Sequence, residues 1–347
     1  MNVNKLVRKN IKDLKPYSSA RGSFLDGVLL DANENSFGSV LDSNLALNRY
    51  PDPNQVELRK AISTYLNIDY KNIFIGVGSD EIIDLLIRIF CEPRIDNVII
   101  CEPTYGMFKV ACDINAIQTK TALLNKNYDI DINEIEKSID GKTKMIFLCS
   151  PNNPTGNLLS IAAIKKVLKI FHGIMVIDEA YIDFAAQNAQ LDLLKEYPNV
   201  VLIRTFSKAW GAAAVRCGYA ITNTEIIDIL FKVKAPYNIN KLTANYIINS
   251  LKQHKEKDKF VKRIIVEREK MIAELSSLQG VLKVFPSQAN YILFKVKNAD
   301  NIYSSLIERG IIIRNRSNQI KLENCLRVSI GTPKENKLFL KELKKLL

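Results

Sequence analysis

Lys208 is the residue whose position most strongly suggests chemistry. It follows Ser207 and lies just beyond the apolar run at residues 200–204, which we interpret as a buried strand. Burial disfavours an ammonium group, so a lysine at such a strand end is often neutral or bonded to a carbonyl compound as an imine. The alternative is a lysine whose stem packs while its head reaches solvent, and for an isolated lysine this is the better interpretation.

Asp178 and Tyr181 are the next candidates. Asp178 ends a second apolar run, residues 173–177, and Tyr181 follows three positions later. Ligands of open α/β sheets bind at the carboxyl edge of the strands, which is where these two side chains are expected. A buried carboxylate needs a partner, and a protonated ring nitrogen would be one; a helix N-cap is the plain alternative.

Two turns add polar groups to the same edge. Asn153 lies in the proline- and asparagine-rich turn at residues 151–156, where its amide can donate to an oxyanion, although a simple tight turn explains the same residues. Residues 76–80 join a strand to a helix whose free amides can bind a phosphate. This turn is not a dinucleotide fingerprint, because Glu81 stands at the third glycine of GxGxxG.

The elements that must position these residues alternate along the chain. Between residues 54 and 222, short β-branched runs alternate with amphipathic stretches, a pattern typical of βα units around a mainly parallel sheet. The expected strands are 72–77, 97–101, 145–148, 175–177, 200–204 and 218–221, and the expected helices are 55–66, 80–90, 161–171 and 225–233. After residue 240, a long charged helical stretch, short strands at 281–284, 291–296 and 326–329, and a closing helix predict a smaller α+β domain.

We therefore divide the chain into three parts. Residues 1–40 are too short to fold alone, so we expect them to pack on the small domain or on a neighbouring subunit. Residues 41–240 form the large domain with the candidate site, and residues 241–347 form the small domain. The length of 347 residues with 47% hydrophobic residues is enough for two cores, and it excludes low-complexity, fibrous and mostly disordered classes.

Composition also narrows the partners. No apolar run approaches the roughly 18 residues of a membrane span and no secretory signal is recognised, so we expect a cytoplasmic protein. The six cysteines form no CxxC pair and the two histidines are too few for a multi-histidine site, so no metal is expected. The net charge of +12 suits small anionic substrates. The densest basic stretch, residues 252–270, carries interleaved acids and reads as a solvated helix face rather than a nucleic-acid surface.

Motifs spread along nearly the whole chain occur together in one enzyme family. They are Pro16-Tyr17, Ser19-Ala20-Arg21, Asn33-Glu34-Asn35, Arg49-Tyr50-Pro51, Gly78-Ser79-Asp80-Glu81, Pro103-Thr104-Tyr105-Gly106, residues 151–156, Asp178-Glu179-Ala180-Tyr181, Ser207-Lys208, Arg216-Cys217-Gly218 and Arg327-Val328-Ser329. With them, the chain resembles the pyridoxal-phosphate-dependent aminotransferases of fold type I, and most closely the histidinol-phosphate aminotransferase family. That fold is α/β, with a mainly parallel seven-stranded sheet between helices in the large domain.

The resemblance implies a role for each matching residue around pyridoxal 5'-phosphate. Lys208 would bond covalently to the cofactor and later move a proton, and Asp178 would keep the ring nitrogen protonated. Asn153 and Tyr181 would contact the ring's phenolic oxygen. The other cofactor-binding residues that the resemblance implies are Tyr105 on the ring face and Ser79, Asp80, Ser207 and Arg216 around the phosphate.

It also implies how substrate and subunits meet. Arg327 matches a clamp for substrate anions, and Arg314 matches a second arginine for a substrate phosphate; either could instead be a surface cation. Tyr17 and Asn33 would line the amino-donor pocket. Tyr50 matches a tyrosine that reaches the cofactor phosphate of the neighbouring subunit, which implies a homodimer.

Two positions depart from the family pattern. Ser36 replaces a common proline, and Ala214 replaces a common glycine just before Arg216. If position 214 had a positive φ, an alanine there would cost stability and could displace Arg216 from the phosphate.

The activity implied is amino transfer between L-histidinol phosphate and 2-oxoglutarate in histidine biosynthesis, giving imidazole-acetol phosphate and L-glutamate. Alternatives are an aromatic or other amino-acid aminotransferase of the same fold and a threonine-phosphate decarboxylase. A ligand-sensing regulator on this fold is remote, because such proteins carry an added DNA-binding domain.

Overall fold

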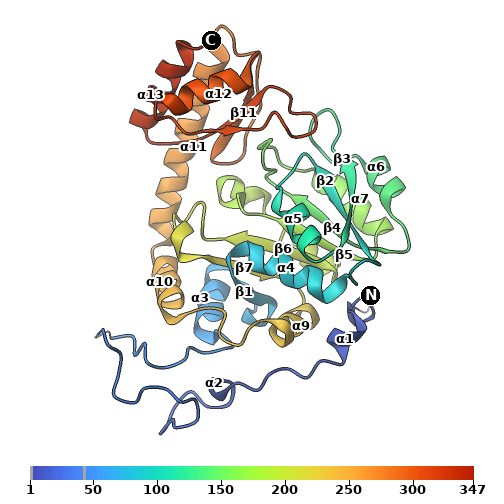
Figure 1. The fold of residues 1–347 in the computed structure, drawn as a ribbon, viewed down its shortest axis with the longest axis vertical. Helices are drawn as coiled ribbons and strands as arrows, with labels where there is room; N and C mark the ends of the chain where they lie inside the picture. Colours follow the sequence, from blue (N-terminus) through green and yellow to red (C-terminus); the bar gives the residue numbers. More distant parts are fainter. Residues whose placement is uncertain (1–2, 42–43) are drawn as a thin grey trace.

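The larger domain is built on a seven-stranded sheet (Figure 1). The computed structural model describes residues 3–41 and 44–347. The strands are β1 (Ile73–Val77), β2 (Asn97–Glu102), β3 (Gln118–Leu123), β4 (Thr143–Cys149), β5 (Ile174–Asp178), β6 (Val200–Thr205) and β7 (Cys217–Ile221). They lie in the order β1-β7-β6-β5-β4-β2-β3, with β7 antiparallel to both neighbours and the remaining pairs parallel. The predicted mainly parallel seven-stranded sheet is confirmed.

Helices cover both faces of this sheet (Figure 1). One face packs on α4 (Gly78–Phe90), α5 (Met107–Ile114) and α9 (Thr224–Val233), and the other on α3 (Val56–Leu66), α6 (Ile132–Ser138), α7 (Ile161–Ile170), α8 (Leu193–Glu196) and α10 (Lys241–Lys252). Successive side chains along each strand point to opposite faces of the sheet. Phe74 therefore packs in the core beneath α4, α5 and α9, while Ile73 and Ile75 pack in the core on the other face. Strands buried on both faces explain the continuous apolar runs of the sequence.

The six strands and four helices predicted here are present, with ends shifted by at most two residues. Strand β3 was missed. It is an edge strand paired with β2 alone, and its residues Gln118, Thr119, Lys120 and Thr121 are polar. An edge strand needs no apolar run, because solvent covers one side of it.

The smaller domain has the predicted α+β composition, and its antiparallel sheet has four strands, one more than the three that we expected. It contains β8 (Lys283–Val284), β9 (Tyr291–Lys295), β10 (Arg314–Asn315) and β11 (Cys325–Ser329), in the order β10-β11-β9-β8, with α11 (His254–Ser277), α12 (Ala299–Glu308) and α13 (Pro333–Lys344). Ile292, Phe294, Leu326 and Val328 form its core against the helices. The opposite face of the sheet is therefore free to meet the large domain.

Helix α11 connects the two domains. Near its start, the Lys257 ammonium donates to the Tyr65 hydroxyl (3.0 Å) and to Asp183 Oδ1 (3.1 Å), both in the large domain. Near its end, Met271 and Leu275 are buried in the small-domain core. One continuous helix thus belongs to both domains (Figure 1).

Within this subunit the N-terminal residues contact the large domain rather than the small domain. Our other expectation, that they pack on a neighbouring subunit, stays a prediction. The first two helices of the chain are η1 (Val3–Lys5) and α1 (Lys9–Lys12). Apolar residues spaced four apart in this region join the core of α4 and α9; they are Val3, Val7 and Ile11. Arg8 Nε pairs with Glu92 Oε2 at 3.0 Å. The following segment, which includes α2 (Ala20–Ser23), runs along the side of the large domain away from the small domain (Figure 1).

We expected the small domain to begin at residue 241, but helix α10 packs in the large domain. Its residues Ile247 and Leu251 are buried in the core that contains Leu58 and Ile62 of α3. We therefore propose that the large domain extends to about Gln253 and that the small domain begins within α11. No helix in the described part of the chain is long and apolar enough to cross a membrane.

A buried ion pair ties the strand that ends at Asp178 to the strand that precedes Lys208. Glu179 Oε2 accepts hydrogen bonds from Arg204 Nε at 2.8 Å and lies 2.7 Å from Arg204 Nη2, while Glu179 Oε1 accepts from the Gln190 amide at 2.9 Å. The Glu179 side chain is fully enclosed and that of Arg204 is 9% exposed.

Replacing Arg204 with methionine should lower the free energy of unfolding by about 3–5 kcal/mol, because the buried Glu179 carboxylate loses its counter-charge. The measurement is urea unfolding followed by circular dichroism. The matched control is Lys165→Met, which breaks the exposed pair with Glu196 (2.8 Å) and should cost about 1 kcal/mol or less. Equal losses in the two variants would contradict this account.

Candidate active site

A cavity of about 150 Å³ lies at the carboxyl ends of the parallel strands. Its lining residues are Ser79, Asp80, Tyr105, Cys149, Asn153, Asp178, Ala180, Tyr181, Thr205, Ser207, Lys208, Ala213 and Arg216. The structure thus brings together every cofactor-binding residue expected from the sequence except Tyr50. Cys149 and Thr205 were not expected, although both end apolar strands and could have been found by the argument that selected Asp178.

Asp178 ends β5 and is buried; it forms no salt bridge with the described residues, although the charge of Lys208 in the same cavity acts on it. Its Oδ1 accepts one hydrogen bond, from the Ala180 amide at 2.9 Å. Burial raises the pKa of the Asp178 carboxyl to about 7. An ionised carboxylate here is costly unless a positive group meets it, so the site fits a ligand with a basic ring nitrogen.

Lys208 lies just after β6, facing the same cavity. Burial lowers the pKa of its ammonium group, and the positive charge of Arg327 lowers it further. Its Nζ lies 5.6 Å from the centre of the Tyr181 ring. These surroundings favour the neutral amine, which is the form that attacks an aldehyde.

The other end of the cavity can hold an anion. Helix α4 begins there without a side-chain cap, so its first-turn amides face this end. Arg216 Nη2 lies 3.5 Å from Asp80 Oδ2. At Gly78, with φ of +72°, an added Cβ would lie 2.7 Å from Arg216 Nη2, so the arginine passes directly over a position that only glycine can occupy.

Ala214 does not carry the strain considered from the sequence. It lies inside the short helix η4 (Ala213–Val215), and the residue with a positive φ is Arg216, at 54°. Arg216 Nη1 donates to the Ala213 carbonyl at 3.2 Å. The alanine therefore leaves Arg216 at the cavity.

Side chains from three loops complete the walls. The Tyr105 hydroxyl donates to Asp80 Oδ1 at 3.2 Å, and its ring packs edge-on against Phe108. Asn153 Oδ1 accepts a hydrogen bond from Arg327 Nη1. Ser207 is fixed by Thr205, whose hydroxyl donates to Ser207 Oγ at 3.0 Å.

The free face of the small-domain sheet contacts two residues that line the cavity, Asn153 and Tyr181. Arg327 of β11 lies over the Tyr291 ring, with Cζ 5.0 Å from its centre. The Tyr291 hydroxyl donates to the Asn152 carbonyl at 2.6 Å, and its ring packs edge-on against Tyr181. Tyr291 carried no signal in the sequence, because it reads as an ordinary apolar position of a strand. Arg314 pairs directly with Arg327 across the two strands, so both arginines lie on this face.

Tyr17, Asn33 and Tyr50 are not brought to this cavity within one subunit. Tyr17 lines a hollow of about 470 Å³ beside Phe231, and Asn33 and Tyr50 line another of about 430 Å³ beside Leu242. The Tyr50 ring stacks on Tyr237 at 4.5 Å. Their positions follow from the N-terminal segment, which runs outside the large domain (Figure 1).

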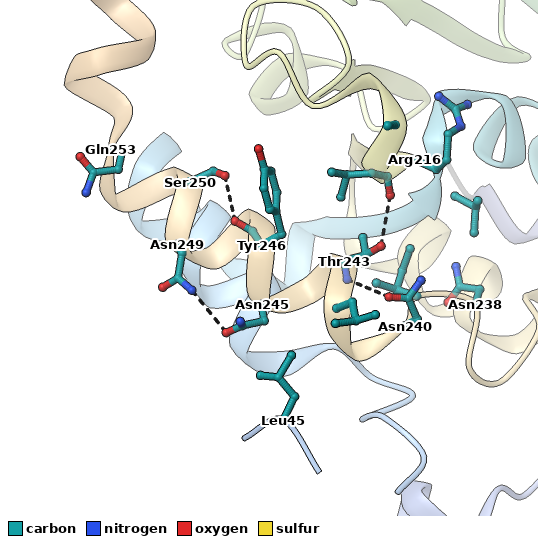
Figure 2. Close-up of a pocket in the computed structure, with 15 residues that line it drawn as sticks. Leu45, Arg216, Asn238, Asn240, Thr243, Asn245, Tyr246, Asn249, Ser250 and Gln253 are labelled. Atoms are coloured by element: carbon teal, nitrogen blue, oxygen red, sulfur yellow. Dashed lines mark hydrogen bonds between the residues drawn. The ribbon is translucent and has the colours of Figure 1, made fainter. Parts of the chain in front are cut away.

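A larger hollow of about 860 Å³ lies next to the cavity, along α10 (Figure 2). Figure 2 shows amide side chains along this helix, with Arg216 at one edge of the hollow and Leu45 at another. Thr243 joins α10 to the cavity wall, because its hydroxyl donates to the Val215 carbonyl at 3.1 Å. This surface therefore reaches Arg216 from outside the cavity.

The arrangement has a definite chemical meaning. It offers a buried carboxylate for a basic ring nitrogen, an amine for an aldehyde, and an arginine with a helix N-terminus for a phosphate. Pyridoxal phosphate carries these three groups.

Comparison with known proteins agrees with this chemistry. The model of the family "Aminotransferase class I and II" matches residues 24–343. The chain is 48% identical to a histidinol-phosphate aminotransferase of Flavobacterium psychrophilum, over 99% of both chains.

Solved structures give the same result. The histidinol-phosphate aminotransferase of Clostridium acetobutylicum is 30% identical and superposes with a TM-score of 0.80 over 86% of this chain and 91% of that one. The enzyme of Sinorhizobium meliloti, solved in complex with pyridoxal-5'-phosphate, shares the fold at 22% identity, with a TM-score of 0.78 over 91% of this chain and 90% of that one. The chain belongs to the class I and II aminotransferases, in the family of the histidinol-phosphate aminotransferases.

Proposed function

We propose that this protein transfers the amino group of L-histidinol phosphate to 2-oxoglutarate, using pyridoxal phosphate. The observation that carries the proposal is Arg327, which donates to the cavity residue Asn153 and has Arg314 directly opposite it on the neighbouring strand. Neither arginine forms a salt bridge with a carboxylate in the described part of the chain. Both substrates are anions. Relatives with this activity match the chain over nearly its whole length.

The bound cofactor supplies an aldehyde that takes up the amino group and a cationic ring that withdraws electrons from the substrate carbon. The protein's own groups make this chemistry available. In our proposal, Asp178 holds the ring nitrogen in its protonated form, because a buried carboxylate favours a positive partner. Ser79, Asp80, Ser207 and Arg216 hold the phosphate.

Lys208 acts at the reacting carbon. Its surroundings lower the pKa of the ammonium group, so the amine can accept a proton from the substrate and return it at another atom. Tyr181 and Asn153 orient the ring's phenolic oxygen, and Tyr105 covers one ring face. The small-domain sheet excludes water above them, which strengthens these interactions.

We propose a homodimer in the cytoplasm as the active form. The N-terminal segment leaves Val28, Phe37 and Val40 almost completely exposed, which is unusual for large apolar side chains. A second subunit would cover them and receive Tyr50 at its phosphate. Tyr17 and Asn33 would reach the amino-donor pocket of the neighbour in the same way.

A panel of amino donors tests the activity. With 2-oxoglutarate as acceptor, L-histidinol phosphate should be converted far faster than phenylalanine, tyrosine or threonine phosphate. Arg314→Ala should lower kcat/KM for histidinol phosphate by about 10- to 100-fold, because it removes a charge-assisted bond to the phosphate. Phenylalanine should be affected much less. Carbon dioxide release from threonine phosphate would identify a decarboxylase, and equal losses for both donors would show that Arg314 does not bind the phosphate.

Asp178 predicts a pH dependence of stability in the cofactor-free protein. Since its pKa of about 7 exceeds the ordinary carboxyl value, the folded state holds this proton more tightly than the unfolded state. Stability from this group is therefore complete below about pH 4 and is lost as pH rises toward 7. Asp178→Asn should remove this loss, whereas Glu274→Gln, an exposed change on α11, should not. Thermal midpoints at pH 5 and 7.5 measure the difference; identical profiles for wild type and Asp178→Asn would refute the assignment.

Subunit complementation tests the role of Tyr50. Lys208→Ala and Tyr50→Ala should each be impaired alone. Coexpressed, they should recover about a quarter of wild-type activity, because half of the dimers are mixed and each mixed dimer has one intact site of two. Tyr50→Ala coexpressed with the double variant Lys208→Ala/Tyr50→Ala should recover none. No recovery despite mixed dimers on native mass spectrometry would place Tyr50 in its own subunit's site.

A further inference from the structure

The sheet face above the cavity carries a third arginine, Arg316. Strand β10 pairs Arg314 with Arg327, and the next ladder bond runs from the Arg316 amide to the Cys325 carbonyl at 2.9 Å. Side chains two residues apart on a strand share a face. Arg314, Arg316 and Arg327 are therefore on the face that meets Tyr181 and Tyr291, opposite the small-domain core.

Arg316 is partly buried and has no hydrogen-bond or ion-pair partner for its side chain among the described residues. Its side chain donates no hydrogen bond to the described residues, and its Nε is buried and unpartnered, as is Nε of Arg327. Burial lowers the pKa of the Arg316 guanidinium, and the charges of Arg327 and Arg314 lower it further. The electrostatic neighbours that oppose them are the phenols of Tyr181 and Tyr291 rather than a carboxylate.

Three neighbouring arginines without a carboxylate partner are unfavourable unless a bound anion neutralises their charge. Partly buried like charges repel one another, and a buried donor without an acceptor destabilises the folded protein. A single carboxylate brings one negative charge, which Arg327 alone already matches. A phosphate monoester brings about −1.5 to −2 at neutral pH and three acceptor oxygens.

The loop that follows Arg316 joins the two domains. Ser317 Oγ and Gln319 Oε1 are also buried and unpartnered. Further along, the Lys321 ammonium donates to the Leu124 carbonyl, and the Tyr128 hydroxyl donates to the Lys321 carbonyl at 3.1 Å. The large domain therefore fixes the loop whose first residue is Arg316, so its guanidinium is held at the domain boundary.

We propose that Arg316 is a substrate-binding residue that recognises the second negative charge of a phosphate dianion and thereby favours the phosphorylated amino donor over the dicarboxylate acceptor. This inference rests on the proposed function, because the phosphorylated donor is histidinol phosphate. Arg327 serves both substrates, whereas Arg316 discriminates between them.

The test compares Arg316→Gln, Arg316→Lys and the control Arg263→Gln, an exposed arginine on α11. Arg316→Gln should raise KM for histidinol phosphate about tenfold, as expected for one lost charge-assisted bond, with kcat changed less than about twofold and KM for 2-oxoglutarate less than about threefold. Arg316→Lys should restore most of the affinity because it keeps the charge. Arg263→Gln should match wild type.

Calorimetric binding of inorganic phosphate to the cofactor-loaded enzyme gives a readout that does not need turnover. Wild type should bind phosphate more tightly at pH 8 than at pH 6, since more of it is dianionic, and Arg316→Gln should lose most of this difference. Unchanged phosphate binding, or equal KM increases for both substrates, would overturn the proposal. If the Gln variant does not fold, Arg316→Met, which keeps much of the side-chain length without the charge, takes its place: loss of most of the pH dependence supports the proposal, and a pH dependence like that of wild type overturns it.

The same experiment separates the two proposals. An enzyme that binds phosphate through Arg316 but does not convert histidinol phosphate keeps the role of Arg316 as an anion-binding residue and refutes the proposed substrate. If the enzyme converts histidinol phosphate and the Arg316→Gln variant has an unchanged KM, the proposed substrate is supported and the role of Arg316 is refuted.

Discussion

One unpaired carboxylate determines how the rest of the site is arranged. Asp178 is fully buried at the end of a central strand, and its only donor among the described residues is a backbone amide. Burial between the apolar cores on the two faces of the sheet makes ionisation of this carboxyl unfavourable. A cationic group bound beside Asp178 would relieve this cost, so ligand binding and protein stability would be coupled at this residue.

The parallel sheet explains why the other groups gather around that carboxylate. Strands β5 and β6 are neighbours, so the residues that follow their carboxyl ends, Ala180 and Lys208 among them, share one edge. The buried Glu179–Arg204 pair fixes the spacing of the two strand ends. Small changes in that spacing would alter the distance between the acid and the amine.

Much of this was predictable from the sequence, for a physical reason. Strands that are buried on both faces have uninterrupted apolar sequences, so the ends of these strands are easily located. Asp178 and Lys208 lie at or just after two such ends. Strands β3 and β10 give no such signal, because one is a polar edge and the other has two residues. The location of the Arg316 and Tyr291 side chains at the site depends on the strand register of the small sheet and on how this sheet packs on the large domain. No local sequence pattern encodes either of these. The sequence of Val3, Val7 and Ile11 shows that they are apolar, but it does not show which domain or subunit they pack against.

Helix α11 has a mechanical consequence. Lys257 fixes its beginning to the large domain, and Met271 holds its later turns in the small one. Fourteen residues of helix span about 21 Å, so a tilt of about ten degrees at Lys257 would displace the far turns by about 4 Å. That displacement exceeds the length of the hydrogen bond between Arg327 and Asn153, so a slight pivot at one lysine would be enough to break this contact between the two domains.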